Sequence, residues 1–71
     1  MSEALDRAIE EKFQGKPDGY LVRRMETAPD FAYDDEEYEL NRRLALVGKA
    51  WRWSQKYGRD VVVIYEPERS E

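Results

Sequence analysis

Residues 34–57 have the sequence DDEEYELNRRLALVGKAWRWSQKY, the longest stretch of the chain with one consistent pattern. Its acidic start suits the partial positive charge of a helix N-terminus, and Asp34 with Glu37 three residues later resembles a capping box. Gly58 follows as a residue that tolerates the left-handed conformation of a helix C-cap. The sequence therefore predicts one long helix that begins at Asp34 and ends near Tyr57.

Apolar side chains cover a wide arc of this predicted helix. One stripe with helical spacing contains Leu40, Leu44, Val47, Trp51 and Ser54, and a second stripe beside it contains Leu46, Ala50, Trp53 and Tyr57. Because Trp51 and Trp53 would point about 200° apart on a helix, they cannot both fill the same core position. Trp51 belongs to the main stripe, so Trp53 lies either at a second interface or along the margin of a sheet.

The flanking segments predict a short helix and two strands. In residues 3–13, apolar positions recur every three or four residues, which indicates an amphipathic helix that ends at Gly15. Residues 20–26 alternate in a way that predicts a strand, and Ala28-Pro29 predicts a crossing loop after it. Residues 61–65 are apolar throughout and mostly β-branched, which predicts a strand covered on both faces.

The predicted order is helix, strand, long helix, strand. It indicates a small α/β domain, on the border with α+β, that spans residues 1–71 with a single core. The strand, helix, strand portion is long enough for a right-handed parallel crossover. Because two strands alone make a poor sheet, we expect a homodimer or a strand from another protein to complete it.

The residue types present argue against catalysis. The chain contains no histidine and no cysteine, so the usual catalytic dyads and triads and most structural zinc sites cannot be built. Carboxylate chemistry remains, but no pair of acids lies in an obviously apolar context. We expect a protein that is not an enzyme and has no cofactor.

Membrane and secretory signals are absent from the sequence. The first residues, MSEALD, do not form a basic region followed by an apolar run, and no stretch approaches the roughly 18 apolar residues of a membrane span. We therefore expect a cytoplasmic protein.

Charge is distributed unevenly along the chain, whose net charge is −4. Residues 1–39 contain twelve acidic and five basic residues, a balance of −7, whereas residues 40–71 contain four acidic and seven basic residues, a balance of +3. Overall acidity argues against a general nucleic-acid binder, but the second half leaves a local basic surface open.

The densest acidic run is one candidate binding surface. It contains Asp34, Asp35, Glu36 and Glu37, with Tyr33 and Tyr38 on either side. The run lacks the alternating pattern of a calcium loop, and acids at a helix start are explained by the helix dipole, so no metal site is predicted. The run is either a docking patch for a basic partner or a solvated helix start whose tyrosines cover the edge of the core.

A basic stripe is the alternative candidate. On the predicted long helix, four cations fall within about 80° of one another beside Trp53, and these are Arg42, Lys49, Arg52 and Lys56. Basic residues next to an aromatic ring can hold nucleic acid through phosphate contacts and stacking, although many helices simply carry charge on their solvated face.

No motif in the chain is specific enough to identify a family. The sequence therefore predicts a small acidic protein–protein interaction module, an adaptor, regulator or inhibitor of a larger cytoplasmic machine, of the kind found among bacterial or phage accessory proteins. The alternative is a nucleic-acid-binding module that uses the basic stripe.

Overall fold

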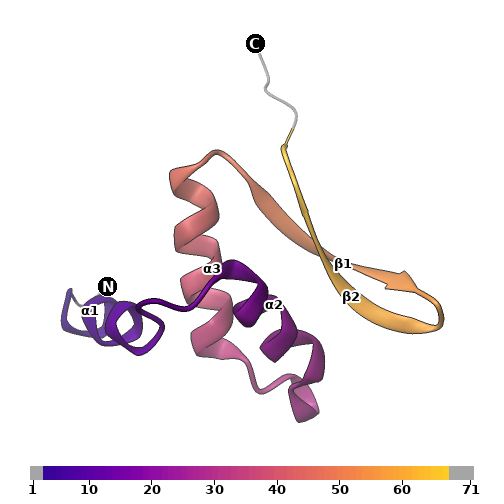
Figure 1. The fold of residues 1–71 in the computed structure, drawn as a ribbon, viewed down its shortest axis with the longest axis horizontal. Coiled ribbons are helices and arrows are strands. Elements are labelled where there is room, and N and C mark those ends of the chain that lie inside the picture. Colours follow the sequence, from indigo (N-terminus) through magenta and orange to yellow (C-terminus); the bar gives the residue numbers. More distant parts are fainter. Residues whose placement is uncertain (1–2, 68–71) are drawn as a thin grey trace.

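The computed structural model describes residues 3–67 (Figure 1). Within them, three α-helices come first: α1 (Glu3–Lys12), α2 (Asp18–Thr27) and α3 (Asp34–Leu46), with a 3-10 turn at Pro29–Phe31. The strands β1 (Ala50–Lys56) and β2 (Arg59–Tyr65) then form an antiparallel hairpin. The predicted mixture of helices with a two-stranded sheet is confirmed, but the order of elements and the parallel crossover are wrong. Helices that are segregated from an antiparallel sheet are the α+β arrangement.

The first helix agrees with the sequence prediction. Ile9 and Phe13 lie four residues apart, and both are buried in the core. After the helix, Gly15 has a φ of 79°, a left-handed conformation that lets the chain turn toward α2.

The predicted strand at residues 20–26 is wrong, because this segment lies within α2. Leu21 and Met25 are both buried, and a separation of four residues places them on one face of a helix. The same two positions also fit an alternating strand pattern, so periodicity over so short a segment does not separate the two structures. The loop predicted at Ala28-Pro29 is confirmed, and Ala28 is extended before the proline.

The long helix predicted to end near Tyr57 ends instead at Leu46. Gly48 has a φ of 70°, the Lys49 amide donates to the Leu44 carbonyl at 2.9 Å, and the Gly48 amide donates to the Ala45 carbonyl at 3.4 Å. These two hydrogen bonds form a Schellman motif, which ends the helix. As a result, two members of the predicted apolar stripes, Leu46 and Val47, are 76% and 64% exposed.

The hairpin replaces the second half of the predicted helix. The strand predicted at residues 61–65 is confirmed as part of β2, and its partner β1 pairs with it from Ala50 opposite Tyr65 to Lys56 opposite Arg59. Tyr57 and Gly58 connect the strands with φ values of 53° and 78°, as in a two-residue type I′ turn. The strand is not covered on both faces: Val62 packs against the core from one face, and the adjacent Ile64 and Tyr65 remain 38% and 39% exposed.

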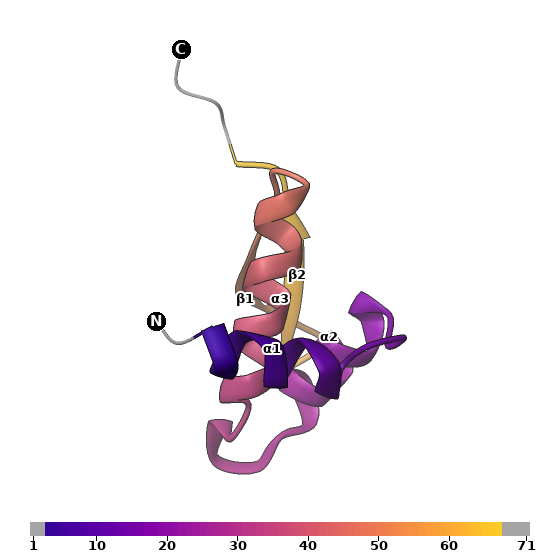
Figure 2. The same ribbon diagram turned by 90° about the vertical axis from the view of Figure 1, so that its left-hand side faces the viewer.

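The helices and the hairpin share one core. Among the side chains that the structure describes, the buried apolar ones come from the three helices and from Phe13 directly after α1, and they are Ile9, Phe13, Leu21, Met25, Leu40 and Leu44. Trp51, Trp53 and Val62 of the hairpin pack against this cluster. Figure 2 shows α1 and α3 in front of the hairpin and α2 on the β2 side. The hairpin therefore has an inner face that meets the helices and an outer face that does not.

The helix end at Gly48 gives a test of the fold. We expect Gly48→Ala to lower the free energy of unfolding by about 1 kcal/mol, because alanine is strained at positive φ. Gly19→Ala is the matched control: Gly19 lies inside α2 without positive φ, and its substitution should raise stability by up to about 1 kcal/mol. Urea denaturation measures both, and a stabilising Gly48→Ala would instead support a helix that continues through residue 48.

Candidate binding surface on the hairpin

The acidic run occupies the first turn of α3, where two of its four carboxylates form ion pairs within the chain. Lys12 Nζ donates to Asp35 Oδ2 at 2.8 Å, and Arg24 Nε donates to Glu36 Oε2 at 3.2 Å. The Glu36 side chain is buried. These two acids therefore hold α1 and α2 against the start of α3, and the remaining two, Asp34 and Glu37, are at least partly exposed. Within residues 3–67, no acidic cluster could hold a metal ion.

The tyrosines that flank the acidic run contact other parts of the chain. The Tyr33 ring lies 5.6 Å from the Trp53 ring, and Trp53 Nε1 donates to the Tyr33 hydroxyl at 3.2 Å. The Tyr38 hydroxyl donates to Asp6 Oδ1, and this hydrogen bond raises the pKa of Tyr38 above its usual value. Both tyrosines thus lie at the edge of the core, as the solvated-helix interpretation of this run expects.

The predicted basic stripe does not exist as a helix face. Arg42 lies on α3 and is bound to Glu39, Lys49 lies in the connection to the hairpin, and Arg52 and Lys56 lie on β1. The structure keeps only Arg52 and Lys56 together, because residues four apart in a strand point to the same side.

The two tryptophans lie on the same face, contrary to the prediction of a 200° separation. Residues two apart in a strand share a face, and the Trp51 and Trp53 rings meet edge to face with centroids 5.7 Å apart. Trp51 Nε1 also donates to Asn41 Oδ1 of α3 at 2.6 Å. Trp53 therefore belongs to the inner face of the hairpin and not to the surface that carries Arg52 and Lys56.

The outer face of the hairpin is the strongest candidate for a binding surface. Strand alternation and the register place eight side chains on it: Ala50, Arg52, Ser54, Lys56, Arg59, Val61, Val63 and Tyr65. The three cations are exposed and the two valines are half-buried. The Arg52 guanidinium lies 5.7 Å from the centre of the Tyr65 ring. None of these eight described side chains is acidic, so together they combine an apolar centre with positive charge.

Of these eight residues, only Arg52 and Lys56 were named as candidates from the sequence. Sequence reasoning missed the whole β2 side of the face, Arg59, Val61, Val63 and Tyr65, because a strand covered on both faces presents no surface. A clue to them was the alternation of residues 50–56, which are followed by Gly58 and then by the β-branched run at residues 61–65, an order that a hairpin with a tight turn at Gly58 explains.

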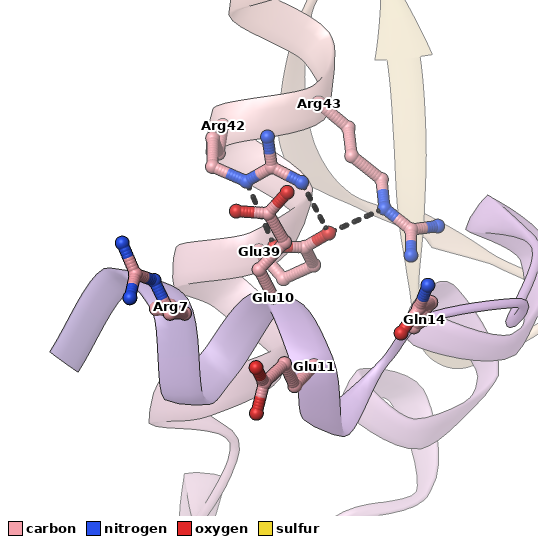
Figure 3. Close-up of a pocket in the computed structure, with 7 residues that line it drawn as sticks. All are labelled: Arg7, Glu10, Glu11, Gln14, Glu39, Arg42 and Arg43. Atoms are coloured by element: carbon pink, nitrogen blue, oxygen red, sulfur yellow. Dashed lines mark hydrogen bonds and ion pairs between the residues drawn. The ribbon is translucent and has the colours of Figure 1, made fainter. Parts of the chain in front are cut away.

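A pocket of about 440 Å³ lies between α1 and α3 and is a weaker candidate (Figure 3). Three carboxylates and three guanidinium groups line it together with an amide, and these belong to Arg7, Glu10, Glu11, Gln14, Glu39, Arg42 and Arg43. Equal numbers of opposite charges give the pocket no preference for an anion or a cation. Its buried lining residue, Glu39, already accepts hydrogen bonds from arginine on both carboxylate oxygens.

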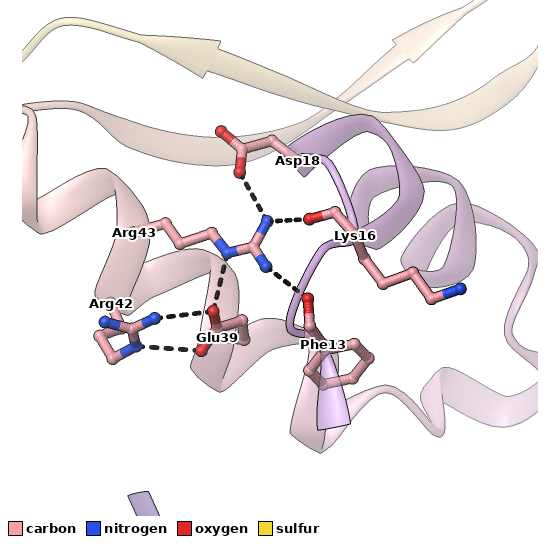
Figure 4. A network of polar contacts seen from close by, with 6 residues as sticks. All are labelled: Phe13, Lys16, Asp18, Glu39, Arg42 and Arg43. Atoms are coloured by element: carbon pink, nitrogen blue, oxygen red, sulfur yellow. Dashed lines mark hydrogen bonds and ion pairs between the residues drawn. The ribbon is translucent and has the colours of Figure 1, made fainter. Parts of the chain in front are cut away.

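The Glu39 network has a structural role instead (Figure 4). Glu39 is 1% exposed and accepts two hydrogen bonds from Arg42 and one of 2.7 Å from Arg43. Arg43 also donates to the Lys16 carbonyl at 2.6 Å, the Phe13 carbonyl at 3.0 Å and Asp18 Oδ1 at 3.0 Å. Arg43 therefore ties α3 to the turn between α1 and α2.

Comparisons with family models, with curated proteins and with solved structures find no match to this chain. The binding surface is therefore argued from its residues alone. No helix within residues 3–67 has the length and apolar character needed to cross a membrane.

The Glu39 network predicts a pH-dependent stability. Burial raises the pKa of Glu39, but the hydrogen bonds from Arg42 and Arg43 outweigh burial, so the pKa lies below its ordinary value of 4.5. Because the pKa is lower in the folded state, the stabilisation is complete above the unfolded-state pKa and is lost as the pH falls through the folded-state pKa.

We expect Glu39→Gln to lower the free energy of unfolding at neutral pH by about 2 kcal/mol, since it leaves two half-buried guanidinium groups without their carboxylate. Denaturation at a series of pH values should show that the variant loses less stability on acidification than the wild type. Glu37→Gln, on the same helix, is the matched control and should cost less than about 0.5 kcal/mol. Parallel pH profiles for wild type and Glu39→Gln would contradict this role.

The shared face of the tryptophans predicts similar contributions to stability. Both rings are half-buried, and each indole nitrogen has a hydrogen-bond acceptor. Trp51→Ala and Trp53→Ala should each lower the free energy of unfolding by about 2 to 3 kcal/mol. Tyr57→Ala, at the exposed turn, should change it by less than about 0.5 kcal/mol. A loss for Trp53→Ala as small as that control would place Trp53 outside the packed interface.

Proposed function

We propose that this chain is a protein-binding module that docks its partner on the outer face of the hairpin. The observation that supports the proposal is the composition of that face. Val61, Val63 and Tyr65 supply apolar surface, and Arg52, Lys56 and Arg59 supply charge beside it. An apolar centre with tyrosine and arginine at its margin is typical of protein interfaces. In this role the protein is an adaptor, regulator or inhibitor of a larger cytoplasmic assembly.

The chemistry of the face favours an acidic partner. Its side chains carry three positive charges and no negative charge, so a carboxylate-rich surface would gain favourable contacts with Arg52, Lys56 and Arg59. Most of the chain's carboxylates lie in the helical half, and this arrangement leaves the hairpin as a separate positive surface.

The acidic run at the start of α3 is the weaker docking surface. Asp35 and Glu36 are engaged by Lys12 and Arg24, and Glu36 is buried. A basic partner would have to displace these ion pairs to use the whole run. Of the four acids in the run, only Asp34 and Glu37 could contact a partner without the loss of one of these ion pairs.

Nucleic acid is the second candidate for the same face. Three cations beside the exposed Tyr65 could contact phosphates and stack on a base. The half-buried valines at the centre of the face favour a protein, since they provide apolar area that a phosphate backbone does not use. The two candidates differ in sensitivity to nuclease and to salt.

A pair of charge reversals tests the proposal. Three immobilised proteins are used for capture with and without nuclease: the wild type, an Arg52→Glu/Lys56→Glu variant and an Asp34→Lys/Glu37→Lys variant. The protein captured in the presence of nuclease is then purified for titration. We expect the hairpin variant to weaken its binding by at least about tenfold and the helix variant to change it by less than about twofold.

Circular dichroism and urea denaturation of both variants serve as the folding control. The reverse order of effects would place the docking surface at the start of α3. Loss of capture on nuclease treatment alone would favour nucleic acid.

A further inference from the structure

The backbone of the hairpin has two edges with different surroundings. Lys56 and Arg59 flank the two-residue turn and therefore form a hydrogen-bonded pair, in which each amide donates to the other residue's carbonyl. Every second pair along the hairpin after it is hydrogen-bonded in the same way. The amides and carbonyls of the intervening residues point away from the partner strand. On β1 these are residues 51, 53 and 55, and on β2 they are residues 60, 62 and 64.

The β2 edge is already capped by a side chain. The Val62 amide donates to Glu26 Oε2 at 2.8 Å, and Glu26 lies near the end of α2. This carboxylate occupies the place that the carbonyl of an added strand would take. A further strand cannot pair along the middle of β2 unless Glu26 moves away.

The β1 edge is open. Within residues 3–67, the amides of Trp51, Trp53 and Gln55 have no hydrogen-bond acceptor. Unpaired amides and carbonyls along a strand are a template for another strand. The segment from residue 47 to residue 56 contains Lys49, Arg52 and Lys56 and no acidic residue, so its charge is complementary to an acidic chain.

We propose that β1 accepts an extended acidic segment of a protein partner as a third strand. This inference rests on the proposed function and specifies how the partner binds. The added backbone would lie about 4.8 Å from β1, and its alternate side chains would lie on the outer face beside Arg52 and Lys56. Backbone pairing would supply affinity, and the charges would select acidic sequences.

A second copy of this chain fits the edge less well. Pairing of β1 with its symmetry mate would put the cations of both outer faces on one four-stranded sheet with no carboxylate on that face. Like charges on neighbouring strands are destabilising. The homodimer expected from the sequence is therefore an alternative occupant that the experiment has to exclude.

The test uses a capped peptide of about ten residues in which glutamate and valine alternate. Amide hydrogen exchange of the full chain, followed by NMR, reports the edge directly. With saturating peptide we expect exchange at Trp53 and Gln55 to slow by at least about tenfold, with no change at Val62. Unchanged exchange at Trp53 and Gln55, or slowing at the β2 edge instead, would overturn the proposal.

Two N-methylated isomers of the peptide separate strand pairing from charge attraction. Methylation of the valine amides blocks an antiparallel added strand, and methylation of the glutamate amides blocks a parallel one. The isomers carry the same charge, so strand addition predicts that one of them binds at least about tenfold more weakly than the other. Equal affinities of the two methylated peptides would reject strand addition. They would not reject docking on the outer face, which the charge-reversal variants test separately.

Two further controls identify other occupants. The first is amide exchange without peptide at several protein concentrations. If exchange at Trp53 and Gln55 slows as the protein concentration rises, the edge binds a second copy of the chain, and the proposal of an acidic partner segment is overturned. A single-stranded oligonucleotide is titrated in the same way. If it shifts the NMR signals of Tyr65 and Arg52 and the peptide does not bind, the result would overturn the acidic protein segment as occupant and favour nucleic acid. The Arg52→Glu/Lys56→Glu variant should bind the unmodified peptide at least about tenfold more weakly.

Discussion

A buried carboxylate at the centre of α3 is the constraint on which the helical part of the fold depends. Glu39 is almost inaccessible to solvent, so its charge must be balanced within the protein. Arg42 and Arg43 both bind it, and Arg43 uses its remaining donors on the carbonyls of Phe13 and Lys16. One guanidinium group therefore links the charge balance of α3 to the path of the chain between α1 and α2.

The elements that follow strong local signals could be predicted from the sequence. The first helix, the start of α3 and the strand at residues 61–65 are all present as expected. The predicted helix was wrongly extended beyond residue 46 for a specific reason. Val47 and Trp51 lie on either side of Gly48 and are four residues apart, so the end of α3 and the start of β1 together show the spacing of one helix. Gly48 was the only local sign of a break, and a glycine within a helical pattern does not by itself end a helix.

The candidate surface could be predicted only in part, because the residues that lie on the same face differ between a helix and a strand. Arg52 and Lys56 remain neighbours in a strand as they would in a helix, whereas Trp53 moves to the opposite face and Arg59 joins them from β2. The acidic run was located correctly in the sequence, but its partners Lys12 and Arg24 come from two other helices. Ion pairs between distant segments depend on packing, which local patterns do not encode.

The sequence separation of the contacts suggests an order of assembly. The hairpin joins neighbouring segments across the turn at Tyr57 and Gly58, so it can form by local pairing alone. Arg43, in contrast, bonds to residues that precede it by most of the helical half of the chain. Contacts of this kind carry the larger loop-closure entropy and form late. We therefore expect the hairpin to pair before Arg43 closes the turn between α1 and α2 during folding.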